Sequence, residues 1–365
     1  MRSVTVAIAA PERPTTLPQG ARRAPAVFAA QGCCAGVASR GPVGAASAPA
    51  RRACILGAIF WRPARFRVPP CVLRRALRRL LFAPLRFSGA VPSSVRLAPP
   101  SVGTGPTVSR ELVRGLEHEL DTAAASIPAL RRFHSLLEAL PADAVASRLA
   151  PVWAELCYNL ESFNPVFTAV MLKVQCTIGQ SDYVRRDEAL QCLIVPLAGE
   201  YGLAPEYKLG KTHRKLFSDF YASVTGASLE AMLAGRPASP HAEAFFAAML
   251  RDVATGGGGA DAMEQASYAL GYNLAVEYLA AYEKTWMLDA FRVLDQRVLA
   301  AQGKQLDWVF LEVHAVGEPM HAELGHNAVT ALVPAAHAHI LRRAMADHDR
   351  DFAAFYNALA DMLEA

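Results

Sequence analysis

Residues 312–326 read Glu-Val-His-Ala-Val-Gly-Glu-Pro-Met-His-Ala-Glu-Leu-Gly-His, which gathers three of the chain's ten histidines and three glutamates. His314, Glu318 and His321 stand four and then three residues apart, on one face of a helix over about 10 Å. Glu318 and His321 have the Glu-x-x-His spacing that aims two ligands inward in di-iron carboxylate bundles. Carboxylate and imidazole without thiolate suit iron or manganese better than structural zinc. The alternative is a solvated amphipathic face.

Pro319 interrupts the same segment. A proline inside a helix removes one backbone hydrogen bond and disfavours helical geometry at the residue before it. We expect a helix that continues past Pro319 with a kink, because the apolar residues before it keep helical spacing. In the alternative, a new helix begins at Pro319, His314 points elsewhere, and Glu323 or His326 takes its place.

Two upstream segments supply further candidate ligands. Residues 206–213 read Glu-Tyr-Lys-Leu-Gly-Lys-Thr-His, so Glu206 and His213 would lie two turns apart on one face if the segment is helical. Glu277 lies in a helical pattern that is apolar around most of its circumference. A buried carboxylate needs a partner, such as a metal ion or an arginine, or a raised pKa. Glu283 is the competing carboxylate of this helix, but its neighbours predict a solvent-facing position.

The helical pattern begins at Ser109 and continues to the C-terminus. Ser109, followed by acidic residues, is typical of a helix N-cap. Further helical segments are predicted at about 128–139, 142–160, 164–177, 183–198, 211–224, 228–234, 240–254, 261–282, 284–302, 305–325, 327–345 and 347–364. Breakers such as Asn164-Pro165 separate them, although several pieces could merge. No alternating β run is convincing, so the predicted class is all-α, a bundle of seven to ten helices.

Charge divides the chain near residue 110. Residues 1–110 hold 17 of the 37 basic residues, all arginine, and one acidic residue, Glu12. The remainder therefore holds 20 basic and 32 acidic residues. We predict a disordered basic tail over residues 1–108 and one all-α domain over residues 109–365. The lysine-free, Arg/Ala/Pro-rich tail is also what a start codon assigned too early in a high-GC gene produces; a targeting or tethering segment is the alternative.

Composition excludes several other classes. No run of 18 or more apolar residues is present, so we expect no transmembrane segment. The seven cysteines form no C-x-x-C and fit neither a zinc ribbon nor a disulfide framework. Free thiols in a reducing cytoplasm are the prediction. We expect no nucleic-acid partner, and a homodimer is possible.

Six residues on three segments resemble, in their order, the ligand pattern of the heme-oxygenase-like diiron oxidase and oxygenase superfamily, often called iron-containing redox enzymes: Glu206, His213, Glu277, His314, Glu318 and His321. The resemblance covers about residues 190–335. It implies a heme-oxygenase-like helical bundle, a metal site in which these six residues bind two ferrous ions (Fe²⁺) per domain, and O2 as a reactant. The superfamily more often has aspartate where Glu318 stands.

The resemblance also implies a class of reaction. A non-heme diiron oxidase or oxygenase would act on a small organic substrate, such as an amino acid, an amine or a fatty acid. N-oxygenation and oxidative C–C cleavage are among the reactions of the superfamily, and an electron donor is a possible partner. One alternative is a metal-free enzyme of the same fold, resembling thiaminase or the quinone-cofactor maturation oxidase. The other is a non-enzymatic all-α interaction module whose tail contacts a membrane or nucleic acid.

Overall fold

The structure, a computed structural model, describes residues 105–179, 182–203 and 209–365. These residues belong to one compact unit of the chain, Val91–Ala365. Apart from two isolated β-bridges, the regular elements in these ranges are all helical. The predicted all-α class is therefore confirmed. The predicted tail lies almost entirely outside the described residues.

Ten α-helices run through these ranges, which agrees with the predicted seven to ten: α2 (Arg110–Ala123), α3 (Ser126–Ala139), α4 (Val145–Gln175), α5 (Tyr183–Glu200), α6 (His213–Thr225), α7 (Leu229–Ala234), α8 (Pro240–Thr255), α9 (Ala262–Leu294), α10 (Val309–Leu332) and α11 (Ala338–Glu364). Short helical turns join some of them: η2 (Gly256–Gly258), η3 (Asp295–Leu299), η4 (Ala300–Gln302) and η5 (Ala335–His337).

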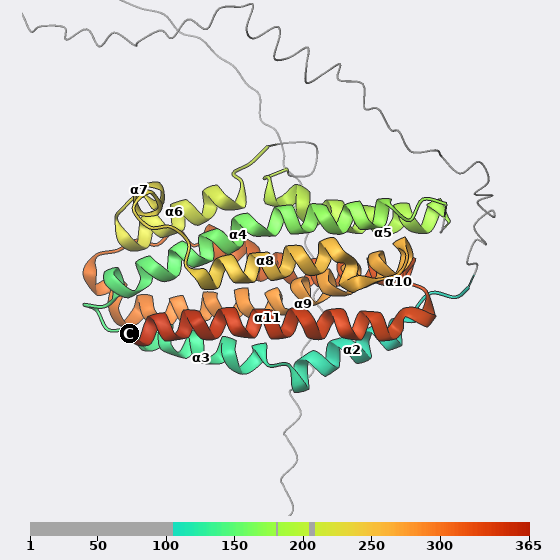
Figure 1. Ribbon diagram of the computed structural model, residues 1–365. Helices are drawn as coiled ribbons and strands as arrows, with labels where there is room; N and C mark the ends of the chain where they lie inside the picture. The colour runs from blue at the N-terminus through green and yellow to red at the C-terminus, as the bar shows by residue number, and fades with distance from the viewer. Residues whose placement is uncertain (1–104, 180–181, 204–208) are drawn as a thin grey trace, which may run out of the picture. The chain divides into compact units, whose positions relative to one another are not determined.

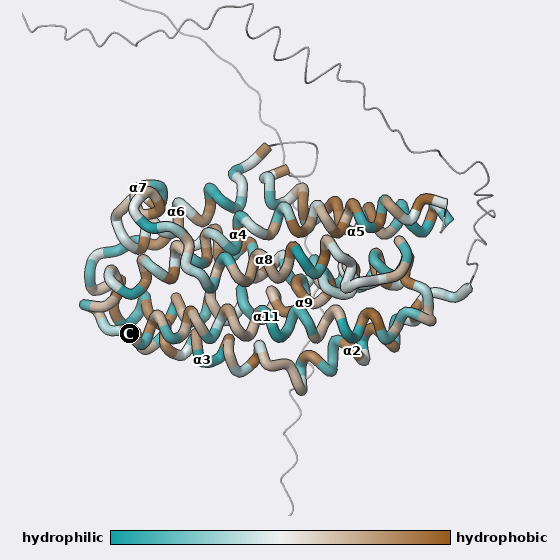
Figure 2. The backbone as a smooth tube through the Cα atoms, in the orientation of Figure 1, coloured by the Kyte–Doolittle hydropathy of each residue, from teal (hydrophilic) through white to brown (hydrophobic). Residues whose placement is uncertain are grey.

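Helix α9 lies at the centre of the bundle. It packs against α3, α4, α8, α10 and α11. In Figure 1, α2 and α3 (teal) lie along one edge beside α11 (red), and α4 and α5 (green) lie along the opposite edge. Apolar and polar residues alternate along most of the helices in Figure 2. This is the pattern of helices that bury one face and leave the other in water.

Ser109 caps the first of these helices as predicted. Its hydroxyl accepts a hydrogen bond from the backbone N–H of Leu112 over 3.2 Å. The preceding residue, Val108, is buried, and its N–H donates to the carbonyl of Val333 over 2.9 Å. The start of the helical bundle is therefore tied to the turn that follows α10.

One predicted break does not occur, because helix α4 continues through Pro165. Helix α10 continues through Pro319, as expected. Both prolines are exposed. A proline cannot donate the backbone hydrogen bond to the carbonyl one turn earlier. Because that carbonyl lies on the exposed side of the helix, water can replace the missing donor, which lowers the cost of the proline. The break predicted near residue 326 instead falls at residues 333–337, next to Pro334.

Aromatic packing fixes the position of α6, which begins at His213. The fully buried ring of Trp153 on α4 meets Phe217 and Phe220 of α6 edge-on, with centroids 5.0 and 5.4 Å away. It also stacks on Phe291 of α9 at 5.5 Å. Buried aromatic pairs of this kind stabilise by about 0.5–1.5 kcal/mol each beyond their burial. The start of α6 is thus held against the two helices that line the core.

A glycine allows α9 to approach α11 closely. A Cβ atom at Gly271 would stand 3.0 Å from the Cα of Leu341 and 3.1 Å from the Cβ of Ala344. Such distances are shorter than normal carbon–carbon contacts. Any larger residue at position 271 would therefore push α11 away from α9, the helix that carries Glu277.

Candidate metal centre

Helix α10 presents the three predicted residues to the interior. His314 and Glu318 are 3% and 6% exposed, and His321 is half-buried. Because α10 is continuous through Pro319, His314 stays on the same face as the other two. The alternative ligands lie elsewhere. Glu323 pairs with arginines of α2, and Nδ1 of His326 lies 2.9 Å from Glu117 of α2.

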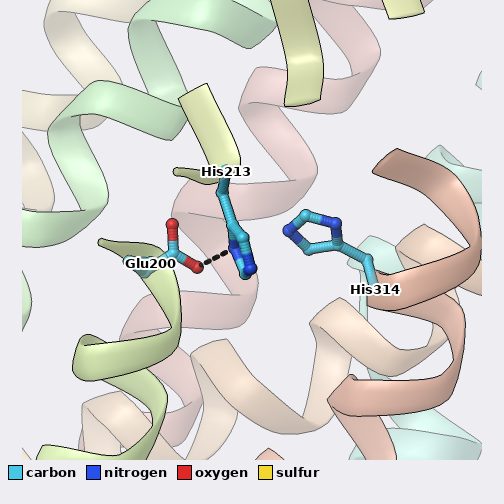
Figure 3. A group of neighbouring side chains, drawn as sticks. All are labelled: Glu200, His213 and His314. Atoms are coloured by element: carbon cyan, nitrogen blue, oxygen red, sulfur yellow. Dashed lines mark hydrogen bonds and ion pairs between the residues drawn. The ribbon is translucent and has the colours of Figure 1, made fainter. Parts of the chain in front are cut away.

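The first group, here called the Glu200 triad, joins three elements. Glu200 ends α5, His213 begins α6, and His314 projects from α10. Nδ1 of His213 lies 2.7 Å from Oε1 of Glu200, and the two imidazole centroids are 4.3 Å apart. Figure 3 shows the His213 ring between the Glu200 carboxylate and the His314 ring. One ligand atom from each residue falls within 4.8 Å of the others, so the three can hold one metal ion.

The second group, the Glu277 triad, joins α9 to α10. Nδ1 of His321 lies 3.2 Å from Oε2 of Glu318 and 3.8 Å from Oε2 of Glu277. The three residues again place one ligand atom each within 4.8 Å of the others. Oε1 of Glu277 is buried and has no hydrogen-bond partner among the described residues. A buried carboxylate oxygen without a partner is costly, and a cation would satisfy it.

The charges of the two triads perturb each other. Burial, followed by the nearby carboxylates of Glu318 and Glu200, raises the pKa of Glu277 well above its usual range. Burial and the neighbouring His213 ring hold the pKa of His314 well below its usual range, so this imidazole is neutral. Three carboxylates in one apolar interior repel one another unless protons or cations lie between them.

A backbone contact fixes the orientation of His314. Its Nδ1 lies 2.6 Å from the carbonyl oxygen of Phe310, one turn earlier on α10. Because a carbonyl only accepts hydrogen bonds, Nδ1 carries the proton, and the lone pair is on Nε2. Metal-ligating histidines in proteins are commonly held in this way by a bond from the other ring nitrogen. His314 is therefore in the tautomer that offers Nε2 to a metal ion.

One cavity, with an empty volume of about 780 Å³ including solvent at its mouth, borders both triads. Several helices, α9 included, supply its apolar lining. The lining residues on α4, α8 and α11, here called the apolar wall, are Leu156, Leu160, Phe163, Phe245, Met249 and Phe352. Outside the triads, Glu283, Lys284 and His348 are among its polar lining residues. Burial would lower the pKa of Lys284, but Glu283 and the triad carboxylates raise it above its ordinary value.

Five of the six predicted ligands lie in the two triads: His213, Glu277, His314, Glu318 and His321. The sixth, Glu206, lies outside the described residues, so its assignment stays a prediction. Glu200 occupies the carboxylate position beside His213 and was missed. Leu209–Thr212 are not helical, so a continuous helix from Glu206 to His213 is not formed.

Glu200 and Glu283 show how far the burial of a carboxylate could be predicted from the sequence. Glu200 follows the buried Leu193 and Pro196 at helical spacing, so the periodicity of α5 could have placed it on the buried face. The prediction that Glu283 faces solvent is wrong, since it is 3% exposed. Lys284 and Tyr356 both donate hydrogen bonds to its Oε1. These two partners make burial of the carboxylate possible.

The donor sets of both triads fit divalent iron or manganese. Each offers carboxylate oxygen and imidazole nitrogen, and neither contains a thiolate. Hard oxygen donors with neutral imidazole suit these ions, and their number per triad leaves coordination positions for other ligands. Two features favour a bound cation over a purely structural cluster: Oε1 of Glu277 has no partner among the described residues, and the Nδ1 contact of His314 leaves the ring's lone pair on Nε2.

Comparison with solved structures identifies the fold. A CADD-like protein of unknown function from Nostoc punctiforme matches with a TM-score of 0.52 and 14% identity, over 69% of this chain and 96% of that one. A second crystal structure of the same protein gives a TM-score of 0.50, also at 14% identity, over 70% and 95% of the two chains. The bundle is thus an all-α, CADD-like fold. No family model matches the sequence, and no curated protein does either.

In the part of the chain that the structure describes, no helix combines the length and apolarity that a bilayer span requires.

Proposed function

We propose that this protein is a non-heme, two-iron enzyme that uses O2 to oxidise a small organic substrate in the cytoplasm. The observation that carries the proposal is the pair of Glu/His triads on one cavity. The order of the ligand residues along the chain resembles the diiron superfamily named above, and the CADD-like fold is compatible with it. An apolar cavity with a few convergent polar groups is the usual form of a small-molecule site.

Each triad would hold one ferrous ion. Glu200, His213 and His314 would bind the first, and Glu277, Glu318 and His321 the second. When bound, the iron pair supplies the capacity to bind O2 and to deliver electrons to it. The hydrogen bond from His314 to the Phe310 carbonyl holds the imidazole ready for that role.

The protein contributes placement and the exclusion of water. The apolar wall on α4, α8 and α11 presents few groups that could hydrogen bond to water, so a bound substrate is desolvated on that side. Glu277 is 2% exposed, which keeps its carboxylate available to a cation rather than to solvent. The substrate therefore lies between the apolar wall and the triads.

Anaerobic titration with ferrous iron tests the proposal. We expect close to two equivalents per chain, followed by a transient visible absorption band when O2 is added. Glu277→Gln should lower the stoichiometry towards one, because the second triad loses its unpartnered carboxylate. The exposed Glu312 of α10 provides a matched control, and Glu312→Gln should leave the stoichiometry at two.

A stoichiometry near zero would contradict the proposal. It would favour the metal-free enzyme of the same fold, in which the buried carboxylates act on substrate directly. Two equivalents without any response to O2 would leave a metal protein but remove the oxidase assignment.

A further inference from the structure

Lys284 has hydrogen-bonding capacity that the protein does not use. Its ammonium has three N–H donors, and among the described residues its hydrogen-bond acceptor is Oε1 of Glu283, 2.7 Å away. The same oxygen also accepts from Tyr356, so the acceptor is shared. Of the Lys284 side chain, 14% is accessible, and the residue lines the cavity. A buried ammonium with spare donors is costly unless an acceptor enters.

The charge in the cavity changes sign when the triads are filled. Its lining includes four carboxylates, on Glu200, Glu277, Glu283 and Glu318, and one ammonium, on Lys284. The histidines that bind metal must be neutral. Two divalent cations and Lys284 together bring five positive charges against four negative ones. The filled cavity therefore attracts an anion and repels a cationic amine.

We propose that the Lys284 ammonium binds the carboxylate of the substrate, which is a small carboxylic acid with an apolar body. This inference rests on the proposed function, because the positive charge of the cavity depends on the two metal ions. The apolar wall, with Leu160, Phe163 and Phe352 among its residues, receives the body of the acid. Lys284 acts as a positioning residue, holding one end of the substrate beside the triads.

Isosteric probes on zinc-loaded full-length protein test this without oxidation chemistry, because zinc has no redox activity. Calorimetry measures the binding of octanoate, octan-1-ol and octylamine. We expect octanoate to bind about 10-fold or more tighter than the alcohol, the usual gain from a charge-assisted hydrogen bond. Octylamine should bind more weakly than either. Zinc content, measured on the same samples, should remain near two equivalents.

The variants separate recognition from folding. Lys284→Met leaves Glu283 buried without its cation, so the double variant Glu283→Gln/Lys284→Met is the cleaner change. Lys284→Met should lose the preference for octanoate over octanol. The double variant keeps the net charge of the filled cavity but lacks the ammonium donor, so its preference should fall, and Lys284→Arg should keep it. Lys173 of α4, hydrogen bonded to Gln265, gives the matched control, and Lys173→Met should change nothing. Circular dichroism confirms that each variant is folded.

Three results would overturn the inference. An unchanged octanoate preference in the double variant would mean that the metal ions alone hold the carboxylate. Equal binding of octylamine would remove the charge argument. Failure of the wild-type chain to bind zinc would overturn the proposed function and, with it, the premise used here, whereas zinc binding without octanoate binding would overturn only the Lys284 assignment.

Discussion

Glu277→Gln should stabilise the metal-free protein and weaken its response to metal. Glu277 is 2% exposed, its Oε1 has no partner within the described ranges, and its pKa is raised by burial and by Glu318 and Glu200. A neutral amide at this position removes one charge and can donate to the carboxylate of Glu318. Relief of an unsatisfied buried group is worth about 1–3 kcal/mol. For a domain of this size that corresponds to a rise in Tm of about 3–10 °C.

The sign of the pH dependence follows from the raised pKa. A carboxyl group that holds its proton more tightly in the folded state stabilises the fold fully below its ordinary pKa of 4.5. That contribution is lost as pH rises through the higher pKa of the folded state. The difference in Tm between Glu277→Gln and the wild type, measured in EDTA, should therefore grow from pH 5 to pH 8. Glu312→Gln should show no such trend.

Metal binding favours the wild type over the variant. At a free metal concentration of 100 times Kd, each occupied site stabilises the fold by about 2.7 kcal/mol, so the wild type, with both triads intact, should gain more than the variant. Thermal unfolding followed by circular dichroism, with EDTA and with zinc, measures both effects. If Glu277→Gln is less stable than the wild type in EDTA at pH 8 and gains equally from zinc, the carboxylate is a structural group and the reasoning fails.

Three further outcomes are expected. His348→Phe should stabilise the metal-free protein by about 1–3 kcal/mol in denaturant unfolding, because both ring nitrogens are buried without partners in the part of the chain that the structure describes and the ring stacks on Phe352. His314→Ala should lose about half of the bound iron by elemental analysis, while His326→Ala should keep both equivalents and lower the Tm, since His326 contacts α2 rather than a triad. A chain that starts at Ser101 should retain the wild-type Tm, because it keeps Pro106 and Val108, whose backbone hydrogen bonds tie the start of the bundle to the turn after α10.

Local periodicity made the α10 ligands predictable. The spacing of His314, Glu318 and His321 is a property of one helix, and the structure keeps all three on its inner face. Ser109 was predictable for the same reason, since a cap acts on the residues that directly follow it. The helix break predicted at Pro165 was wrong. The sequence shows that a proline removes one helical hydrogen bond, but it does not show that this proline faces solvent.

Contacts between segments that are distant in the sequence were harder to predict from local patterns. The burial of Glu283 depends on Tyr356, 73 residues away, which donates to its carboxylate. Nothing in the local sequence around Glu283 identifies that partner, and its polar neighbours indicate solvent. Glu200 is an intermediate case, because its place on the buried face of α5 is local but its contact with His213 depends on the loop between two helices.

The surroundings of the two triads distinguish a metal site from a purely structural cluster of side chains. A structural carboxylate is satisfied by hydrogen bonds from its neighbours, as Glu283 is by Lys284 and Tyr356. The Glu277 triad instead leaves one oxygen bare, places it near two further carboxylates, and lies beside a histidine whose free nitrogen is neutral. Such a cluster lowers the stability of the folded chain when it is empty. Its cost is offset only when cations bind, which is why stability in EDTA is as informative about this site as iron content.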